Sequence, residues 1–102
     1  MDPGMIDRAL LLADIERDEG YREKPYRDTN GNLTVGFGLN LVTLALTREE
    51  AAYLRDNRLD LAEKQIKERW PWFLVLTEPR QRAMVEMAYQ LGIGGIAKFV
   101  KF

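Results

Sequence analysis

The sequence contains no cysteine and no histidine among its 102 residues. Without cysteine, disulfide bonds and thiol nucleophiles are excluded, and the redox compartment is left open. Without histidine, Ser-His-Asp and Cys-His catalysis, most zinc sites and imidazole acid–base chemistry are excluded as well. Any catalysis therefore has to use carboxylates, hydroxyls, lysine, arginine or tyrosine.

The chain also has no large excess of positive or negative charge, and it has no long apolar run. Its net charge is −1, with lysine and arginine spread along the sequence, which argues against nucleic acid as a partner. Apolar runs such as residues 9–13 are too short to cross a bilayer, and the N-terminus lacks the pattern of a secretory signal. With 46% hydrophobic and 30% charged residues, the composition is that of one small globular domain.

Apolar residues recur at helical spacing near the N-terminus and predict a helix from about residue 3 or 5 to 18. Pro3 suits its first turn, with Asp2 as the cap. Gly20 ends this helix and leaves Glu19 near its C-terminus.

Residues 24–38 have the character of a β-hairpin. The pair Asn30-Gly31 lies in a turn cluster and is a strong hairpin signal. In the returning strand, apolar residues alternate with small ones, so one face is apolar and the other is open. The glycines either provide ordinary twist or let something approach the backbone closely.

A capping box of Thr47 and Glu50 predicts a long charged helix that runs to about Arg69 and is stopped by Pro71. Three aromatic side chains stand in the connection that follows: Trp70, Trp72 and Phe73. Such side chains either anchor the core between helices or stack on a sugar, and the core role is the commoner one.

The last predicted helix opens at residues 77–79. Its apolar stripe follows the helical template: Met84, Met87, Ala88 and Leu91. Gly92 closes this helix, and Gly94-Gly95 is expected to form a flexible joint before a new apolar segment at Ile96.

Glu19, Asp28 and Thr34 are the residues that suit glycoside hydrolysis, because a helix end and two strands can bring them to one surface. That reaction needs one carboxyl group that donates a proton and a second that stays ionised. The partial negative charge at a helix C-terminus disfavours an anion, which suits Glu19 as the acid. Turn N–H groups can hold Asp28 ionised, and Thr34 can orient a water molecule.

Each of these residues also has an ordinary structural role. A glutamate beside a glycine at a helix end is usually solvated. An aspartate in a turn usually forms an Asx turn, and a threonine in a strand is usually there for its β-propensity.

The exact pattern closely resembles the phage-type lysozymes, the endolysins of glycoside hydrolase family 24. The resemblance rests on residues 18–20 (Asp-Glu-Gly), 26–29 (Tyr-Arg-Asp-Thr) and 33–38 (Leu-Thr-Val-Gly-Phe-Gly). It continues through residues 81–92 to Gly95 and Phe99. Agreement covers most of residues 8 to 100.

The resemblance implies an α+β fold, mostly helical and lysozyme-like, with a small β-hairpin or sheet. It implies a bacteriolytic muramidase that hydrolyses the β-1,4 bond between N-acetylmuramic acid and N-acetylglucosamine in peptidoglycan. Glu19 would be the general acid, Asp28 the second carboxylate and Thr34 the residue that positions the water, in an inverting reaction. The substrate-binding candidates are Gln90, Gly36 and Leu39. No metal and no cofactor is implied.

The sequence departs from the family at Leu39, where a histidine is frequent, and at Glu86, where asparagine is frequent. The segment between the hairpin and the long helix is short. The resemblance also implies further helices after Phe99, so we expect a C-terminally truncated form with an exposed helical stripe. We therefore expect self-association, or a partner that covers this stripe. The alternative function is a weakly active or inactive cell-wall binding or protein-interaction module.

One lysozyme-like domain is expected over residues 1–102, with a hairpin-bearing lobe at 5–46 and a helical part at 47–102. The expected partner is the peptidoglycan glycan strand, with no nucleic acid and no stable membrane insertion. Synthesis in the host cytoplasm would be followed by action at the periplasmic cell wall, after holin-type release or virion delivery.

Overall fold

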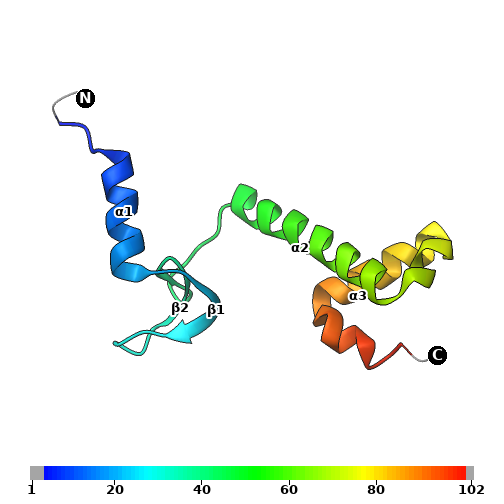
Figure 1. Ribbon diagram of the computed structural model, residues 1–102. Coiled ribbons are helices and arrows are strands. Elements are labelled where there is room, and N and C mark those ends of the chain that lie inside the picture. The colour runs from blue at the N-terminus through cyan, green and yellow to red at the C-terminus, as the bar shows by residue number, and fades with distance from the viewer. Residues whose placement is uncertain (1–3, 101–102) are drawn as a thin grey trace. The chain divides into compact units, whose positions relative to one another are not determined.

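The computed structural model describes residues 4–100 and has three α-helices, one 3₁₀ helix and three short strands (Figure 1). Their order is α1 (Arg8–Glu19), β1 (Arg22–Arg27), β2 (Leu33–Gly36), β3 (Leu39–Asn40), α2 (Arg48–Arg69), η1 (Pro71–Val75) and α3 (Glu78–Ala97). The predicted fold class, α+β and mostly helical with a small sheet, is confirmed. No helix between residues 4 and 100 is long and apolar enough to cross a membrane.

The chain forms two compact units, Met1–Ala45 and Leu46–Phe102, here called the N-terminal unit and the helical unit. The N-terminal unit holds α1 and the sheet, and the helical unit holds α2, η1 and α3. Whether they act as one lysozyme-like domain stays a prediction.

Helix α1 begins later than the sequence suggested. Asp7 is the N-cap, and its carboxylate accepts a hydrogen bond from the Leu10 N–H at 3.2 Å. The start at residue 3 or 5 is therefore wrong, because an aspartate closer to the apolar stretch satisfies the first free N–H groups. The predicted cap Asp2 and first-turn Pro3 lie outside the described residues. The C-terminal end is as predicted, with the Gly20 N–H bonded to Glu16 O at 2.9 Å.

The three strands form one antiparallel sheet in the order β1-β2-β3. The predicted hairpin at Asn30-Gly31 is confirmed, and Gly31 takes the positive φ of 81° that such a turn needs. Thr34 in β2 pairs with Tyr26 in β1 and with Asn40 in β3. Strand β2 is thus the central strand of the sheet, and its middle carries the candidate water-positioning residue.

Strand β1 carries a bulge that the sequence pattern did not reveal. A regular ladder from the Tyr26–Thr34 pair would place Arg22 opposite Gly38, yet Arg22 pairs with Gly36. Strand β1 therefore has more residues than β2 between these two pairs. Pro25 lies within this irregular stretch, at the edge of the sheet, where a missing N–H is tolerated. The bulge therefore changes the register of β1 on β2 at the end of β1 that follows α1.

The capping box predicted for α2 is confirmed. The Thr47 hydroxyl accepts from the Glu50 N–H at 3.1 Å, and the Glu50 carboxylate accepts from the Thr47 N–H at 2.9 Å. The hydrogen bond from the Thr47 N–H to the Glu50 carboxylate lowers the pKa of Glu50, and the Thr47 side chain adds a smaller contribution in the same direction. Helix α2 ends at Arg69, just before Pro71, as expected.

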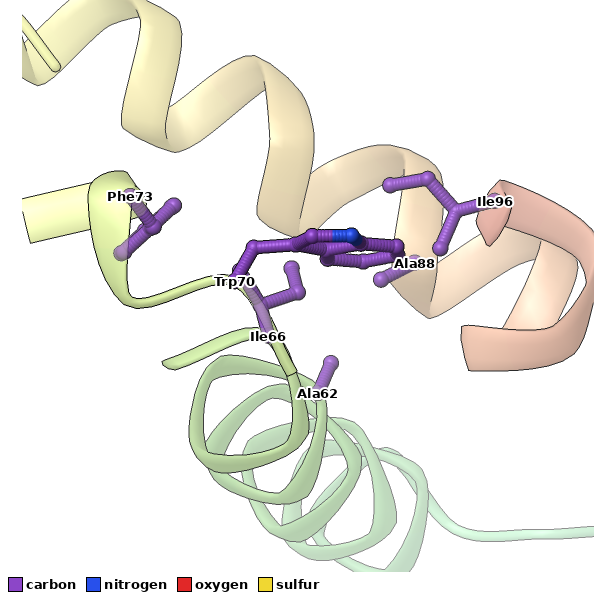
Figure 2. Packing of buried hydrophobic residues seen from close by; sticks show 6 residues of the cluster. All are labelled: Ala62, Ile66, Trp70, Phe73, Ala88 and Ile96. Atoms are coloured by element: carbon purple, nitrogen blue, oxygen red, sulfur yellow. The ribbon is translucent and has the colours of Figure 1, made fainter. Parts of the chain in front are cut away.

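The hydrophobic core of the described residues lies in the helical unit (Figure 2). Its buried members are Ala62, Ile66, Trp70, Phe73, Ala88 and Ile96. The Trp70 indole points from the end of α2 toward Ala88 and Ile96 of α3. Trp70 and Phe73 are 3% and 2% exposed, so the interpretation of these two aromatics as core anchors is confirmed. The Gln81 side chain donates to Phe73 O at 3.0 Å and fixes η1 against α3.

Helix α3 has a sharp kink at Gly92, where φ is 75° and ψ is 164°. Only glycine adopts this region of φ and ψ readily. The first helical stretch ends there, as predicted. The expected flexible joint at Gly94-Gly95 is wrong, because the chain resumes as helix through Ala97 and is anchored by the fully buried Ile96.

The predicted apolar stripe of α3 is only partly buried. Ala88 lies in the core and Met84 packs against it, whereas Met87 and Leu91 are 40% and 50% exposed. The stripe therefore has a buried half and an exposed half.

Candidate active site

The carboxylate of Glu19 lies against the backbone of Gly38. A Cβ atom built on Gly38 would be 2.6 Å from Glu19 Oε2 and 2.7 Å from its Cδ. Gly38 also has a φ of 80°, which disfavours any other residue. The glycine is thus required twice, by its backbone conformation and by the side chain that rests on it. Of the two alternatives for the hairpin glycines, close approach holds at Gly38, and the approaching group is Glu19.

Glu19 itself is the last residue of α1, followed by Gly20 with a φ of 67° and a ψ of −179°. This conformation, again one that favours glycine, turns the chain from the helix into β1. The Glu19 side chain is exposed, and no residue between 4 and 100 donates a hydrogen bond to it or pairs with its charge. Its position is therefore set by the turn at Gly20 and the contact with Gly38.

Asp28 is held in the β1–β2 turn by backbone donors. Its Oδ1 accepts from the Asn30 N–H at 2.9 Å and from the Asn32 N–H at 2.8 Å. The residue is half-buried, and its Oδ2 accepts no hydrogen bond from the described residues. Asp28 therefore does both things the sequence suggested: it forms an Asx turn, and it keeps one carboxylate oxygen for another partner.

Thr34 is the buried polar residue of the described chain, at 4% exposure. Its hydroxyl donates to Asn32 O at 3.0 Å, and the Asp28 N–H donates to the same carbonyl at 2.9 Å. A hydroxyl that has given its proton still has two lone pairs to accept from water. Asp28, the candidate base, and Thr34, the candidate water-positioning residue, are thus both held by hydrogen bonds to the backbone of Asn32.

Asn32 was not among the residues singled out from the sequence. The available signal was its place as the last residue of the turn cluster, two positions before Thr34. Its N–H and C=O make the contacts, so its side chain identity carried no direct information.

The three predicted catalytic residues all belong to the N-terminal unit. Asp28 and Thr34 are joined through Asn32, and Glu19 lies on the turn that follows β2. Strand β1 runs between Glu19 and Asp28, and no hydrogen bond joins the two side chains directly. The catalytic roles of Glu19, Asp28 and Thr34 stay predictions.

The predicted substrate-binding residues fall into two sets. Gly36 and Leu39 flank the β2–β3 turn, where Leu39 is 49% exposed and Gly36 has a φ of 67°. A Cβ on Gly36 would meet nothing within 4 Å, so its glycine is required by conformation and not by close approach. Gln90 is an exposed residue of α3, in the helical unit. Their roles in substrate binding stay predictions.

The helical unit has a groove of about 530 Å³ that contains none of the three catalytic candidates. Its apolar lining residues include Phe73, Val85 and Tyr89. Four acidic residues also line it: Asp60, Glu63, Glu78 and Glu86. Glu78 is paired with Arg82 at 2.6 Å. Within residues 4–100, no group of three or more acidic side chains is arranged to hold a metal ion.

Comparison with known proteins gives a family and a relative. The family model for phage lysozyme matches residues 16–100. The pre-baseplate central spike protein Gp5 of Enterobacteria phage T4 is 32% identical over 113 aligned positions, which cover 83% of this chain and 20% of that protein. The chain thus spans about a fifth of the length of this curated relative. Since the alignment has more positions than this chain has residues, the relative carries additional residues within the matched region.

Proposed function

The chain belongs to the phage lysozyme family, and we propose that it hydrolyses the β-1,4 bond between N-acetylmuramic acid and N-acetylglucosamine in bacterial peptidoglycan. Family membership supports a peptidoglycan hydrolase of the glycoside hydrolase type. The observation that carries the proposal is that Asp28 and Thr34 are both hydrogen-bonded to the backbone of Asn32. Thr34 lies in β2, and the turn that follows β2 contains Gly38, against which Glu19 lies.

The proposed reaction is a single displacement with inversion. Glu19 in its protonated form gives its proton to the glycosidic oxygen while the bond from that oxygen to the anomeric carbon breaks. A water molecule held by Thr34 forms the new bond to the anomeric carbon and gives its proton to Asp28. Glu19 ends ionised and Asp28 ends protonated, and exchange with solvent restores both.

Two features of the site support these assignments. The Oδ2 atom of Asp28 accepts nothing from residues 4–100, so it has the capacity to take a proton from water. The Thr34 hydroxyl donates inward to Asn32 O, which leaves its lone pairs for the O–H of the same water.

The test is the clearing of outer-membrane-permeabilised Gram-negative cells, followed by turbidity. The parent chain is expected to clear them, and Glu19→Gln to lose at least about 100-fold of the rate, since it cannot donate the proton. Glu16→Gln, on the same exposed helix, is the matched control and should clear like the parent. Equal rates for the parent and Glu19→Gln would refute Glu19 as the acid.

A second candidate function is a non-catalytic cell-wall binding or protein-interaction module. It is favoured by the exposed apolar side chains of α3, Met87 and Leu91. Under this proposal, Glu19→Gln and the parent sediment equally with purified peptidoglycan and neither clears cells. Association of the chain with itself or a partner through α3 would raise the mass measured by light scattering at micromolar concentration, and a monomeric mass would count against self-association.

We further propose that the chain reaches the periplasmic cell wall after synthesis in the host cytoplasm. Release through a holin-type membrane lesion and delivery within a virion are both compatible with this route. The relative from phage T4 is named a pre-baseplate central spike protein, and this favours virion delivery. Detection of the chain in purified phage particles would separate the two routes.

A further inference from the structure

Two exposed aromatic side chains adjoin the Glu19–Gly38 contact along the chain. Tyr21 is 65% exposed and Phe37 is 47% exposed. Their ring centroids are 5.4 Å apart, with 46° between the ring planes. Because Arg22 pairs with Gly36, Tyr21 and Phe37 are the next residues of the same two paired segments. The bulged register of the sheet therefore brings the two rings together.

The position of this pair distinguishes it from the other exposed apolar side chains of the N-terminal unit. Phe37 is bonded directly to Gly38, on which the Glu19 carboxylate rests. Only Gly20 separates Tyr21 from Glu19. Neighbouring Cα atoms are about 3.8 Å apart, so both rings are attached close to the candidate acid.

We propose that Tyr21 and Phe37 form an aromatic platform that binds a pyranose ring of the glycan strand beside Glu19; this rests on the proposed function. A pyranose presents C–H groups on its faces and hydroxyl groups around its rim. The negative face of an aromatic ring attracts those C–H groups, and the tyrosine hydroxyl hydrogen-bonds to sugar hydroxyls. The contact between the rings holds each in place, which reduces the entropy lost on binding.

The size of the platform selects a sugar over a protein partner. Burying an aromatic side chain completely removes about 150–250 Å² from water, and these two are already partly covered. A stable protein interface needs about 800 Å² on each side. The segment that follows Tyr21, residues 22–24, is fully charged and does not extend the apolar surface. The area matches one sugar ring and falls well short of a protein interface.

The experiment measures sedimentation of the chain with purified peptidoglycan sacculi, in a Glu19→Gln background that prevents cleavage. Phe37→Ala and Tyr21→Ala are each expected to weaken binding about 5- to 10-fold. Phe37→Leu keeps an apolar side chain but has no aromatic face, so it should bind as weakly as Phe37→Ala. Phe37→Tyr keeps the ring and should bind like its background. Tyr53→Ala, which removes a 70% exposed tyrosine of α2, is the matched control and should change nothing.

In the active chain, Phe37→Leu is expected to raise KM about 5- to 10-fold with kcat within about twofold, because a binding platform acts on ground state and transition state alike. Unchanged sacculus binding by Phe37→Leu would overturn the platform. If the parent chain does not cleave sacculi but its binding to them depends on the aromatic rings, the platform would be supported and the proposed catalytic activity would be refuted. A parent chain that neither binds nor cleaves sacculi would overturn both.

Discussion

The Glu19 carboxylate lies against Gly38, so close that it leaves no room for a Cβ atom at that position. This contact joins the end of α1 to the turn between β2 and β3, although β1 and β2 both lie between them in the chain. It explains why a glycine stands at this position even though it is not the tip of the main hairpin.

Gly38→Ala is expected to reduce activity strongly. Its loss of folding stability should be little more than that of an alanine substitution at another glycine with positive φ. The new methyl group would meet the far end of a flexible side chain, so Glu19 would rotate away and the fold would persist. Misplacement of a catalytic group by about 1 Å can cost about 100-fold in rate. Gly31→Ala is the control, since it has a φ of 81° but open space around it. Both should lose about 1–2 kcal/mol in chemical denaturation, and only Gly38→Ala should lose activity.

Thr34→Val tests whether the hydroxyl acts beyond its structural bond. The variant keeps the side chain's shape, and Asn32 O keeps the hydrogen bond from the Asp28 N–H. The expected loss of stability is about 0.5–1.5 kcal/mol, whereas activity should fall by up to about 100-fold. Thr34→Ser restores the hydroxyl and should recover most of the rate in the turbidity assay. Equal activity of the valine and serine variants would show that the hydroxyl has no role in catalysis.

Gly92→Ala is expected to destabilise the helical unit by about 1–3 kcal/mol, because the kink has a φ of 75° and a ψ of 164°, where alanine is strained. Gly94→Ala is the opposite case. Gly94 lies in the resumed helix without a positive φ, and a Cβ there meets nothing within 4 Å. That variant should gain about 0.5–1 kcal/mol. Thermal unfolding followed by far-UV circular dichroism measures both variants. A Gly92→Ala chain more stable than the parent would contradict the kink.

The capping box of α2 makes stability depend on pH on the acidic side. The folded state lowers the pKa of Glu50 below its usual 4.5, so the stabilisation is present above that value and is lost as pH falls through the folded pKa. Glu50→Gln keeps an acceptor but does not titrate. The advantage of the parent in melting temperature should therefore shrink between about pH 6 and about pH 3. Glu49→Gln lies in the same turn without a capping bond, and its difference from the parent should not follow this course.

The features that local sequence determines were predicted well. The Asn30-Gly31 turn, the Thr47–Glu50 box and the stop at Gly20 depend on residues within four positions of one another. These features can be predicted from a short stretch of sequence, because the hydrogen bonds of caps and turns are made between residues close in the chain. One local prediction failed: the first helix was expected to begin at residue 3 or 5, whereas Asp7 caps it and it begins at Arg8.

The features that depend on long-range pairing were missed or left open. The bulge in β1 and the contact of Glu19 with Gly38 follow from how the strands pair, which the residue pattern does not specify. The role of Asn32 in holding Asp28 and Thr34 could not be predicted from its residue type, because its backbone N–H and C=O make the hydrogen bonds. The helix through Gly94-Gly95 was also missed, because burial of Ile96 outweighs the low helix propensity of glycine.

The irregular strand β1 has a consequence for aggregation. Strand β1 is an outer strand of the sheet, and a regular outer strand offers a row of unpaired backbone groups to other chains. Here the bulge, the missing N–H of Pro25 and the charged side chains around it interrupt that row. The opposite edge, β3, is only Leu39–Asn40 and is too short to template another strand. Within the described residues, the sheet therefore offers no long regular edge for edge-to-edge polymerisation.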